Sequence, residues 1–175
     1  FRMPARELTR QYLDRYPPTP TGQTVSITIT SRGCPYRCNF CAAWKVQGGK
    51  FFMRDLDNIV AEVDQTEEEV VYFFDDNSFA NAGRMEQLAD RLQAEGVAKE
   101  YQMWVSSDVI ARNEQLLKKW VDAGLRRVFI GFESFADEHL QDYGKHASVA
   151  TNEHAHDLLR KHQVALSPTF IVRHD

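Results

Sequence analysis

Segments typical of β-strands alternate with segments typical of amphipathic helices along most of the chain. Residues 25–30 alternate apolar and small polar side chains and are rich in β-branched types, which predicts a strand with one buried face. Further strands are predicted over residues 70–74, 101–105, 127–132 and 165–172, and helices over residues 56–63, 85–92, 116–121, 137–143 and 155–159. This order predicts parallel βαβ units, and therefore an α/β fold.

Residues that commonly begin or end helices stand at the predicted boundaries. Asp55 and Asn113 are placed to cap the N-termini of two helices, and Gly96 and Gly124 are placed to end two. The continuous apolar run over residues 70–74 is expected to be a strand covered on both faces.

Two boundaries near the end of the chain are less regular. Thr151 or Asn152 is expected to cap the helix over residues 155–159. Pro168 lies inside the last strand pattern, and a proline cannot donate a hydrogen bond to a central ladder. We therefore expect that strand to begin near Thr169 or to carry a bulge at the proline.

The first residues differ from the rest of the chain. An amphipathic stretch around Leu8 and Tyr12 leads into the proline-rich residues 17–20, so residues 1–23 are expected to be a lead-in or connector segment. Residues 24–175 contain no polar linker and are expected to form one domain. Because the chain begins with Phe1 and stops directly after an apolar run, we expect a piece of a longer protein.

Charge narrows the function classes. The formal net charge of −4 argues against a nucleic-acid partner, and no apolar run reaches the roughly 18 residues of a membrane-spanning helix. Residues 1–50 nevertheless carry eight Lys and Arg against two Asp and Glu. Such a local positive field would stabilise a cluster of thiolates or an anionic ligand.

The three cysteines, Cys34, Cys38 and Cys41, all lie within eight residues. An odd number at such short spacing is a poor framework for disulfides and fits a reducing compartment, so the cytoplasm is the expected location. A loop with the spacing C-x3-C-x2-C can direct three thiolates at one metal centre. A structural zinc ion normally takes four protein ligands, and all six histidines lie at position 139 or beyond. On a four-iron cluster, three cysteines leave one iron open.

Polar residues follow each of the first four predicted strands. The cysteine loop follows the first strand, Asp75 and Asp76 the second, Ser106 and Asp108 the third, and Glu133 the fourth. Because the carboxyl ends of parallel strands share one edge and hold the active site in such folds, we expect these groups to form a site.

The cysteine motif after the first strand, with Phe40 before the last cysteine, resembles the radical S-adenosylmethionine (SAM) superfamily. The resemblance covers residues 24–175 and implies a partial (β/α) TIM-type barrel with about five of six βα units, truncated at the C-terminus. It further implies that Cys34, Cys38 and Cys41 bind a 4Fe–4S cluster whose open iron is chelated by SAM. Reduction would then split SAM into methionine and a 5′-deoxyadenosyl radical.

Positions outside the motif carry the same resemblance. Asp75 and Asp76 stand where the family holds the methionine amino group, and Glu133, in Gly-Phe-Glu-Ser, stands where a glutamate contacts the cofactor. Ser106 and Asp108 are similar to positions that line the same pocket.

The last predicted strand matches the family only in part. Ile171 stands where an isoleucine packs on adenine, whereas Arg173 replaces a common glycine.

The sequences Phe-Phe-Asp-Asp-Asn and Ile-Gly-Phe-Glu-Ser resemble those of the branch of the family that carries an N-terminal cobalamin-binding domain. Many of those enzymes are methyltransferases or cyclases, and some act on lipids such as hopanoids. This implies a small-molecule substrate, a lipid among the candidates, and a reductant such as flavodoxin or ferredoxin. Cobalamin would be held by a domain absent from this chain. Two alternatives stay open: a non-enzymatic zinc or iron–sulfur module, and an inactive barrel fragment.

Overall fold

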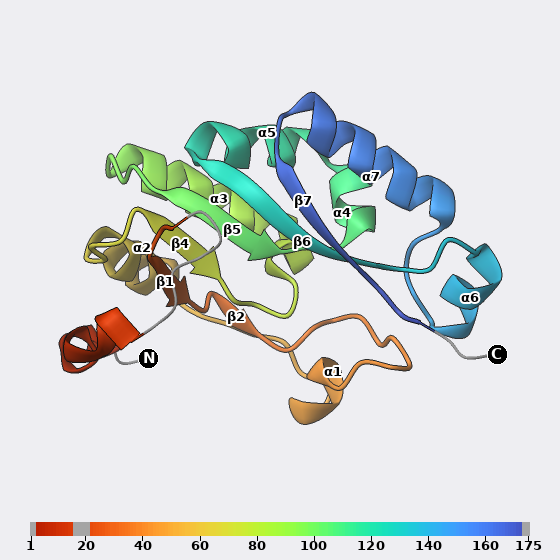
Figure 1. The fold of residues 1–175 in the computed structure, drawn as a ribbon, viewed down its shortest axis with the longest axis horizontal. Coiled ribbons are helices and arrows are strands. Elements are labelled where there is room, and N and C mark those ends of the chain that lie inside the picture. The colour runs from red at the N-terminus through yellow and green to blue at the C-terminus, as the bar shows by residue number, and fades with distance from the viewer. Residues whose placement is uncertain (1–2, 16–21, 173–175) are drawn as a thin grey trace.

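The computed structural model describes residues 3–15 and 22–172. Within them, five parallel strands form one sheet in the order β1-β4-β5-β6-β7 (Figure 1). A short antiparallel pair, β2 and β3, lies outside this sheet. The strands are β1 Val25–Thr28, β2 Ser31–Arg32, β3 Phe52–Met53, β4 Val70–Phe73, β5 Glu100–Trp104, β6 Leu125–Glu133 and β7 Ala165–Phe170.

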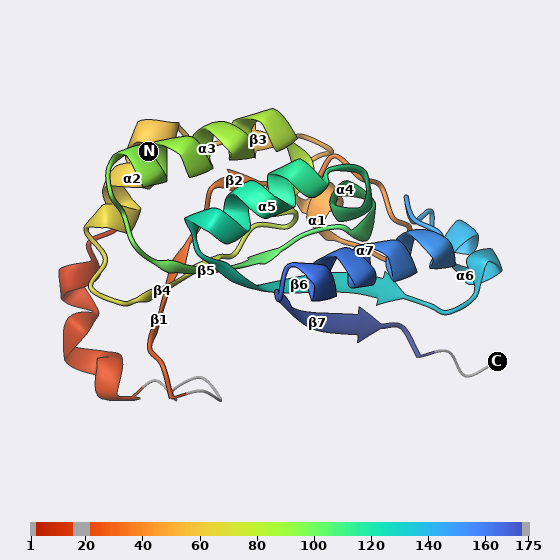
Figure 2. The same ribbon diagram turned by 90° about the horizontal axis from the view of Figure 1, so that it is seen from above.

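The helices α2, α3, α5 and α7 lie on one face of the sheet (Figure 2). Each of these helices comes after a predicted strand in the chain, and the strands of the sheet are parallel. The predicted α/β fold with parallel βαβ units is therefore confirmed. The helices are α1 Ala43–Val46, α2 Leu56–Asp64, α3 Ala82–Ala94, α4 Ser107–Arg112, α5 Glu114–Ala123, α6 Asp137–Asp142 and α7 Val149–Lys161, with 3-10 turns at Arg6–Leu8, Arg10–Arg15 and Ser78–Ala80.

The hydrophobic core lies between the sheet and these helices. Trp120 of α5 packs edge-on against Tyr101 of β5 and Phe73 of β4, with ring centroids 5.4 and 5.8 Å apart, and all three side chains are fully buried. Burying an apolar side chain of this size stabilises the fold by roughly 1.5–3 kcal/mol. This packing holds β4 and β5 in place and so determines where their carboxyl ends lie.

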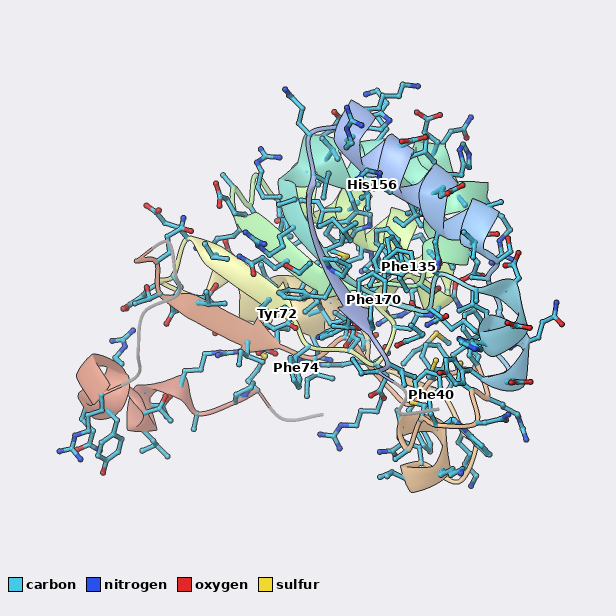
Figure 3. All side chains as sticks on the ribbon, turned by 45° about the vertical axis from the view of Figure 1, so that its right-hand side comes forward. Phe40, Tyr72, Phe74, Phe135, His156 and Phe170 are labelled. Carbon is cyan, nitrogen blue, oxygen red and sulfur yellow. The ribbon has the colours of Figure 1, made fainter. Side chains whose placement is uncertain are left out.

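The other face of the sheet is only partly covered. Tyr72 is half-buried, and Phe74, directly after β4, is 55% exposed (Figure 3). The prediction that residues 70–74 are covered on both faces is therefore wrong. The helices cover one face alone, and on the open face Tyr72 contacts Phe74 and Phe129 with ring centroids 5.2 Å apart in both pairs.

Local chemistry explains most helix boundaries. The carboxylate of Asp55 accepts hydrogen bonds from two backbone N–H groups of α2, and the Asn113 side chain accepts one from Leu116 in α5. Gly124 ends α5 with a φ of 117°, and a Cβ there would lie 2.1 Å from the Lys99 carbonyl oxygen. Only glycine fits such a position. These three predicted boundaries are confirmed.

Two predictions near the chain end are wrong. Ser148, not Thr151 or Asn152, caps α7, because its hydroxyl accepts a hydrogen bond from the Thr151 N–H. Strand β7 runs through Pro168 from Ala165 to Phe170. Within the described sheet β7 is an edge strand, where a missing N–H is tolerated. The irregular register lies instead on β6, between Gly131 and Glu133.

The described part of the N-terminal segment is attached to the domain through a buried carboxylate. Glu62 of α2 is 2% exposed and pairs with Arg6 and with Arg54, and it accepts a hydrogen bond from the Thr28 hydroxyl at 3.2 Å. Arg6 also donates to the Ile27 carbonyl oxygen at 2.7 Å. The network joins the N-terminal turn, β1 and α2. Among the described residues, no helix is long and apolar enough to cross a membrane.

Candidate functional site

The cysteine loop, residues 31–41, lies beyond the carboxyl ends of the sheet strands together with α1 and α6 (Figure 1). It begins where β1 ends and is extended by the β2–β3 pair, which the strand patterns did not predict. The segments after β4, β5 and β6 reach the same edge, as expected for parallel strands.

Asp76 and Gly33 hold the start of the loop. The Gly33 N–H donates to the Asp76 carboxylate (N to Oδ2, 2.9 Å), and Gly33 has a φ of 85°. A Cβ at Gly33 would lie 2.3 Å from the Lys50 carbonyl oxygen. The turn before Cys34 therefore requires glycine, and the exposed carboxylate of Asp76 orients it.

Asp75 is buried, at 3% exposure, and its hydrogen bonds are made within the protein. Its carboxylate accepts from the backbone N–H groups of Thr30 and Ser31 at 2.7 and 2.9 Å, and from the Thr30 hydroxyl at 2.5 Å. Asp75 thus joins the end of β4 to the residues that lead into the cysteine loop.

Replacing Asp75 with asparagine is expected to remove a pH-dependent cost from the folded state. Burial raises the pKa of the Asp75 carboxyl above its ordinary value of 3.8, although the hydrogen bonds from Thr30 and Ser31 oppose the shift. The native state therefore binds the proton more tightly than the unfolded chain. The free energy of unfolding then falls as the pH rises from about 3.8 through the native pKa.

Urea unfolding of both proteins at a series of pH values measures this effect. The quantity to follow is the free energy of unfolding of Asp75→Asn minus that of the parent chain. It should rise with pH across the window, because only the parent has a proton to lose at this position, and it should be constant at higher pH. A difference that does not vary with pH contradicts the prediction.

All three cysteines are free thiols. Cys38 is buried, and Cys34 and Cys41 are half-buried. Burial raises the pKa of Cys34 and of Cys38, and the charges of neighbouring cysteines raise both further, whereas Lys145 lowers that of Cys38. The Cys38 carbonyl oxygen accepts from the indole N–H of Trp44 at 3.1 Å and from the Cys41 N–H at 3.2 Å, which folds the loop back on itself.

The donor set of this loop fits an iron–sulfur cluster. When ionised, the three thiols carry like negative charges that repel one another, and a positive metal centre stabilises such thiolates. Among residues 3–15 and 22–172, no three His, Cys, Asp or Glu side chains converge on a point that could hold a single metal ion. A four-iron cluster binds each thiolate at a different iron, so its ligands stand farther apart than those of one zinc ion.

Asp108 is bonded to the cysteine loop itself. The Tyr36 hydroxyl donates to its Oδ2 at 2.6 Å, and Arg112 of α4 pairs with the same oxygen at 2.7 Å. Burial and the Asp108 carboxylate raise the pKa of Tyr36 to about 12, so the hydroxyl remains a donor at neutral pH. Asp108 therefore anchors the cysteine loop to α4 through its hydrogen bond with Tyr36.

Ser106 lies at the same edge and is 8% exposed. Its hydroxyl accepts from the Asn77 side-chain amide at 3.2 Å, and the Asn77 Oδ1 is buried with no hydrogen-bond partner among the described residues. The end of β4 and the end of β5 are thereby joined, and one buried acceptor is left for a further donor.

Glu133 closes the site from β6. Its backbone has a φ of 64°, which is unusual for a residue other than glycine. The side chain folds over Gly131, where a Cβ would lie 2.0 Å from the Glu133 Oε1, and Lys145 approaches that oxygen at 3.2 Å. The buried carboxylate of Glu133 is therefore paired with the Lys145 ammonium, which offsets the cost of its burial.

The two apolar candidates occupy different positions. Phe40 is 46% exposed on the cysteine loop and contacts Tyr143 edge-on, with ring centroids 5.7 Å apart (Figure 3). Ile171 is half-buried, and its N–H donates to the Glu133 carbonyl oxygen at 2.9 Å. Arg173 lies outside the described residues.

Sequence reasoning missed Tyr36, Asn77 and Lys145. Tyr36 lies inside the cysteine motif, and Asn77 directly follows Asp76, so proximity to known candidates could have indicated both. No comparable signal marks Lys145. All six histidines lie far from the cysteines in sequence, yet the His146 ring lies 4.5 Å from the Tyr36 ring, centroid to centroid.

A mostly apolar cavity of about 770 Å³ lies between α7 and β7. Phe135 and Phe170 stack at one side of it with ring centroids 4.6 Å apart, and His156 lines the other (Figure 3). The cavity is on the helix-bearing face of the sheet and shares no residue with the cysteine loop.

The parallel sheet and the three-thiol loop at its carboxyl edge define an α/β barrel-type protein with a cysteine-rich site. The chain belongs to the Radical SAM superfamily, whose family model matches residues 28–172. The resemblance found in the cysteine motif is confirmed, and the part-barrel architecture with it.

Individual relatives agree with this family. The chain is 28% identical over 173 residues to the hopanoid C-3 methylase of Methylococcus capsulatus, covering 99% of this chain and 33% of that protein. It is 30% identical over 159 residues to the anaerobic magnesium-protoporphyrin IX monomethyl ester cyclase of Cereibacter sphaeroides, covering 87% of this chain and 26% of that protein. The chain thus spans a third or less of these curated relatives.

A solved structure shows the same fold. The cobalamin-dependent SAM radical enzyme OxsB, with aqua-cobalamin bound, aligns with a TM-score of 0.72 at 23% identity, covering 83% of this chain and 23% of that one.

Proposed function

We propose that the chain is the catalytic core of an enzyme that binds a 4Fe–4S cluster at Cys34, Cys38 and Cys41 and reductively cleaves SAM. The single observation that carries the proposal is the loop of three free thiols held beyond the carboxyl ends of a parallel sheet. When bound, a reduced cluster of this type supplies one electron to SAM, which separates into methionine and a 5′-deoxyadenosyl radical.

The surrounding residues give the loop a defined shape. Asp75 and Asp76, which follow β4, accept hydrogen bonds from the loop's first residues, Ser31 and Gly33. The Tyr36–Asp108 hydrogen bond anchors the middle of the loop to α4. Such anchoring matters because metal ligands act only from fixed positions. For Asp75, Asp76 and Asp108 we propose this positioning role; the Asp76 carboxylate is exposed and remains available to a bound amine.

Glu133, Ser106, Phe40 and Ile171 are proposed to contact SAM. Glu133 presents a carboxylate at the end of β6, suited to an ammonium or a ribose hydroxyl, and Phe40 presents an exposed ring from the cysteine loop. Ser106 accepts a hydrogen bond from Asn77, whose buried Oδ1 has no partner among the described residues. Ile171 lies beside Glu133, because its N–H donates to the Glu133 carbonyl oxygen.

The reaction of the whole protein is a finer proposal. A methylase, a cyclase and a cobalamin-dependent enzyme are among the proteins to which the chain is similar, so we propose a methyl transfer or radical cyclisation on a small molecule, a lipid being one class. Cobalamin would be held by another domain, and flavodoxin or ferredoxin would supply electrons. Residues 1–23 would be the lead-in and 24–175 the core. The cytoplasm would be the location, because three cysteines at such short spacing are a poor disulfide framework and fit a reducing compartment.

Formation of 5′-deoxyadenosine tests the proposal. The chain is reconstituted anaerobically with iron and sulfide, reduced with dithionite and supplied with SAM. We expect a reduced-cluster EPR signal that changes when SAM is added, and 5′-deoxyadenosine by chromatography. One tightly held zinc ion with no SAM-dependent EPR change would support the metal-module alternative. A loaded cluster with no product would support the inactive-fragment alternative.

A further inference from the structure

Lys145 is a nearly buried cation at the cysteine loop, yet it lies more than a hundred residues farther along the chain. Its side chain is 12% exposed, and its ammonium lies 3.2 Å from the Glu133 Oε1. The Glu133 side chain is itself 10% exposed. At this burial, solvent screens the Lys145 charge only weakly, so removing that charge changes the electrostatic potential at neighbouring groups.

The loop that carries Lys145 is docked on the cysteine loop by contacts on both sides of it. The Asn39 N–H donates to the Tyr143 carbonyl oxygen at 2.8 Å, and the Asn39 side-chain amide donates to the Asp142 carbonyl oxygen at 2.6 Å. After Lys145, the His146 ring lies 4.5 Å from that of Tyr36. Residues 142–146 therefore contact the cysteine loop at two places, Asn39 and Tyr36.

Gly144 shapes the turn that carries Lys145. Its φ is 62°, a left-handed backbone conformation that favours glycine. The turn after α6 thus places the next residue, Lys145, between Tyr143 and His146, which both contact the cysteine loop, with its ammonium beside Glu133.

We propose that Lys145 is a positioning residue: its ammonium orients the Glu133 carboxylate and keeps a positive charge beside the cysteine loop, which favours the reduced form of a cluster bound there. The inference rests on the proposed function, since it concerns a cluster at the three cysteines. The reason is electrostatic. Reduction adds one negative charge to the cluster, and a nearby buried cation stabilises that charge.

The reduction potential of the reconstituted cluster is the readout, measured by EPR-monitored redox titration without SAM. In Lys145→Gln, the ratio of reduced to oxidised cluster at a fixed potential should fall about tenfold, which corresponds to a shift of about 59 mV to more negative values. Lys145→Arg, which keeps the charge, should titrate like the parent chain. The matched control is Lys118→Gln on α5, whose side chain is 63% exposed and pairs with Asp122.

Lys145→Gln leaves the Glu133 carboxylate buried without its cationic partner, and this variant could therefore fail to fold. A second comparison avoids that problem. Glu133→Gln and the double variant Lys145→Gln/Glu133→Gln differ only in the Lys145 charge, and neither contains that carboxylate. The double variant should titrate at the more negative potential. Affinity for SAM, measured by calorimetry, should fall in Lys145→Gln and be retained in Lys145→Arg, because Glu133 is no longer oriented.

The outcomes separate the two proposals. If the parent chain loads no cluster or forms no 5′-deoxyadenosine, the proposed function fails. If the parent is active but Lys145→Gln titrates with the parent, or if Glu133→Gln and the double variant titrate together, the inference about Lys145 is overturned while the proposed function stands.

Discussion

Replacing Cys38 with alanine is expected to abolish loading of the cluster and, with it, release of 5′-deoxyadenosine from SAM. Cys38 is 7% exposed and forms the middle of the motif, and the chain has only three cysteines. A 4Fe–4S cluster is usually held by four cysteines, and this loop offers three, so the two that remain cannot hold the cluster. Iron and sulfide should fall from about four per chain to near background, and product should fall below detection.

The control for this experiment is Val46→Ala. Val46 lies on α1, close behind the motif in sequence, and is 75% exposed, so its truncation should leave iron content and product formation at the level of the parent. Unchanged iron in Cys38→Ala would show that the cysteine loop is not the cluster site.

Replacing Glu62 with alanine is expected to lower the free energy of unfolding more than the control substitution on the same helix. Glu62 is 2% exposed and balances two guanidinium groups, of which that of Arg54 is also buried. Removing one partner of a buried ion pair costs about 3–5 kcal/mol, because the remaining charge stays out of water. For a chain of this size, that lowers Tm by about 6–20 °C, which thermal unfolding by circular dichroism measures.

Asp57→Ala is the matched control on the same helix. Asp57 pairs with Arg91, but the two side chains are 81% and 47% exposed. An exposed pair contributes about 0–1 kcal/mol, so this variant should melt within a few degrees of the parent. Equal Tm losses in both variants would mean that the Glu62 network is not the attachment of the N-terminal turn that the structure indicates.

Much of the fold could be predicted because its signals are local. Alternation of apolar residues gave β1, and helical spacing with Asp55 and Asn113 as caps gave α2 and α5. Parallel strands necessarily bring their carboxyl ends to one edge, so the prediction that Asp76 and Glu133 lie beyond the same edge as the cysteine loop needed no knowledge of contacts.

The misses have a different physical origin. Helix α4 is only six residues long and follows Ser106 directly, so it is too short for a periodic pattern. Pro168 argued against a continuous strand, but the edge position of β7 removed the objection. Ser148 replaced the predicted caps of α7 because several neighbouring polar residues could all serve.

The sequence alone determined the architecture and the chemistry of the ligands, because periodicity, capping and the cysteine spacing act over a few residues. The tertiary structure alone decided how the cysteine loop is held and what charge lies beside it. Tyr36 meets Asp108, and Asn39 meets Asp142, across separations of 72 and 103 residues. Such contacts arise from the packing of helices on the sheet, and no local pattern encodes the place of Lys145 beside Glu133.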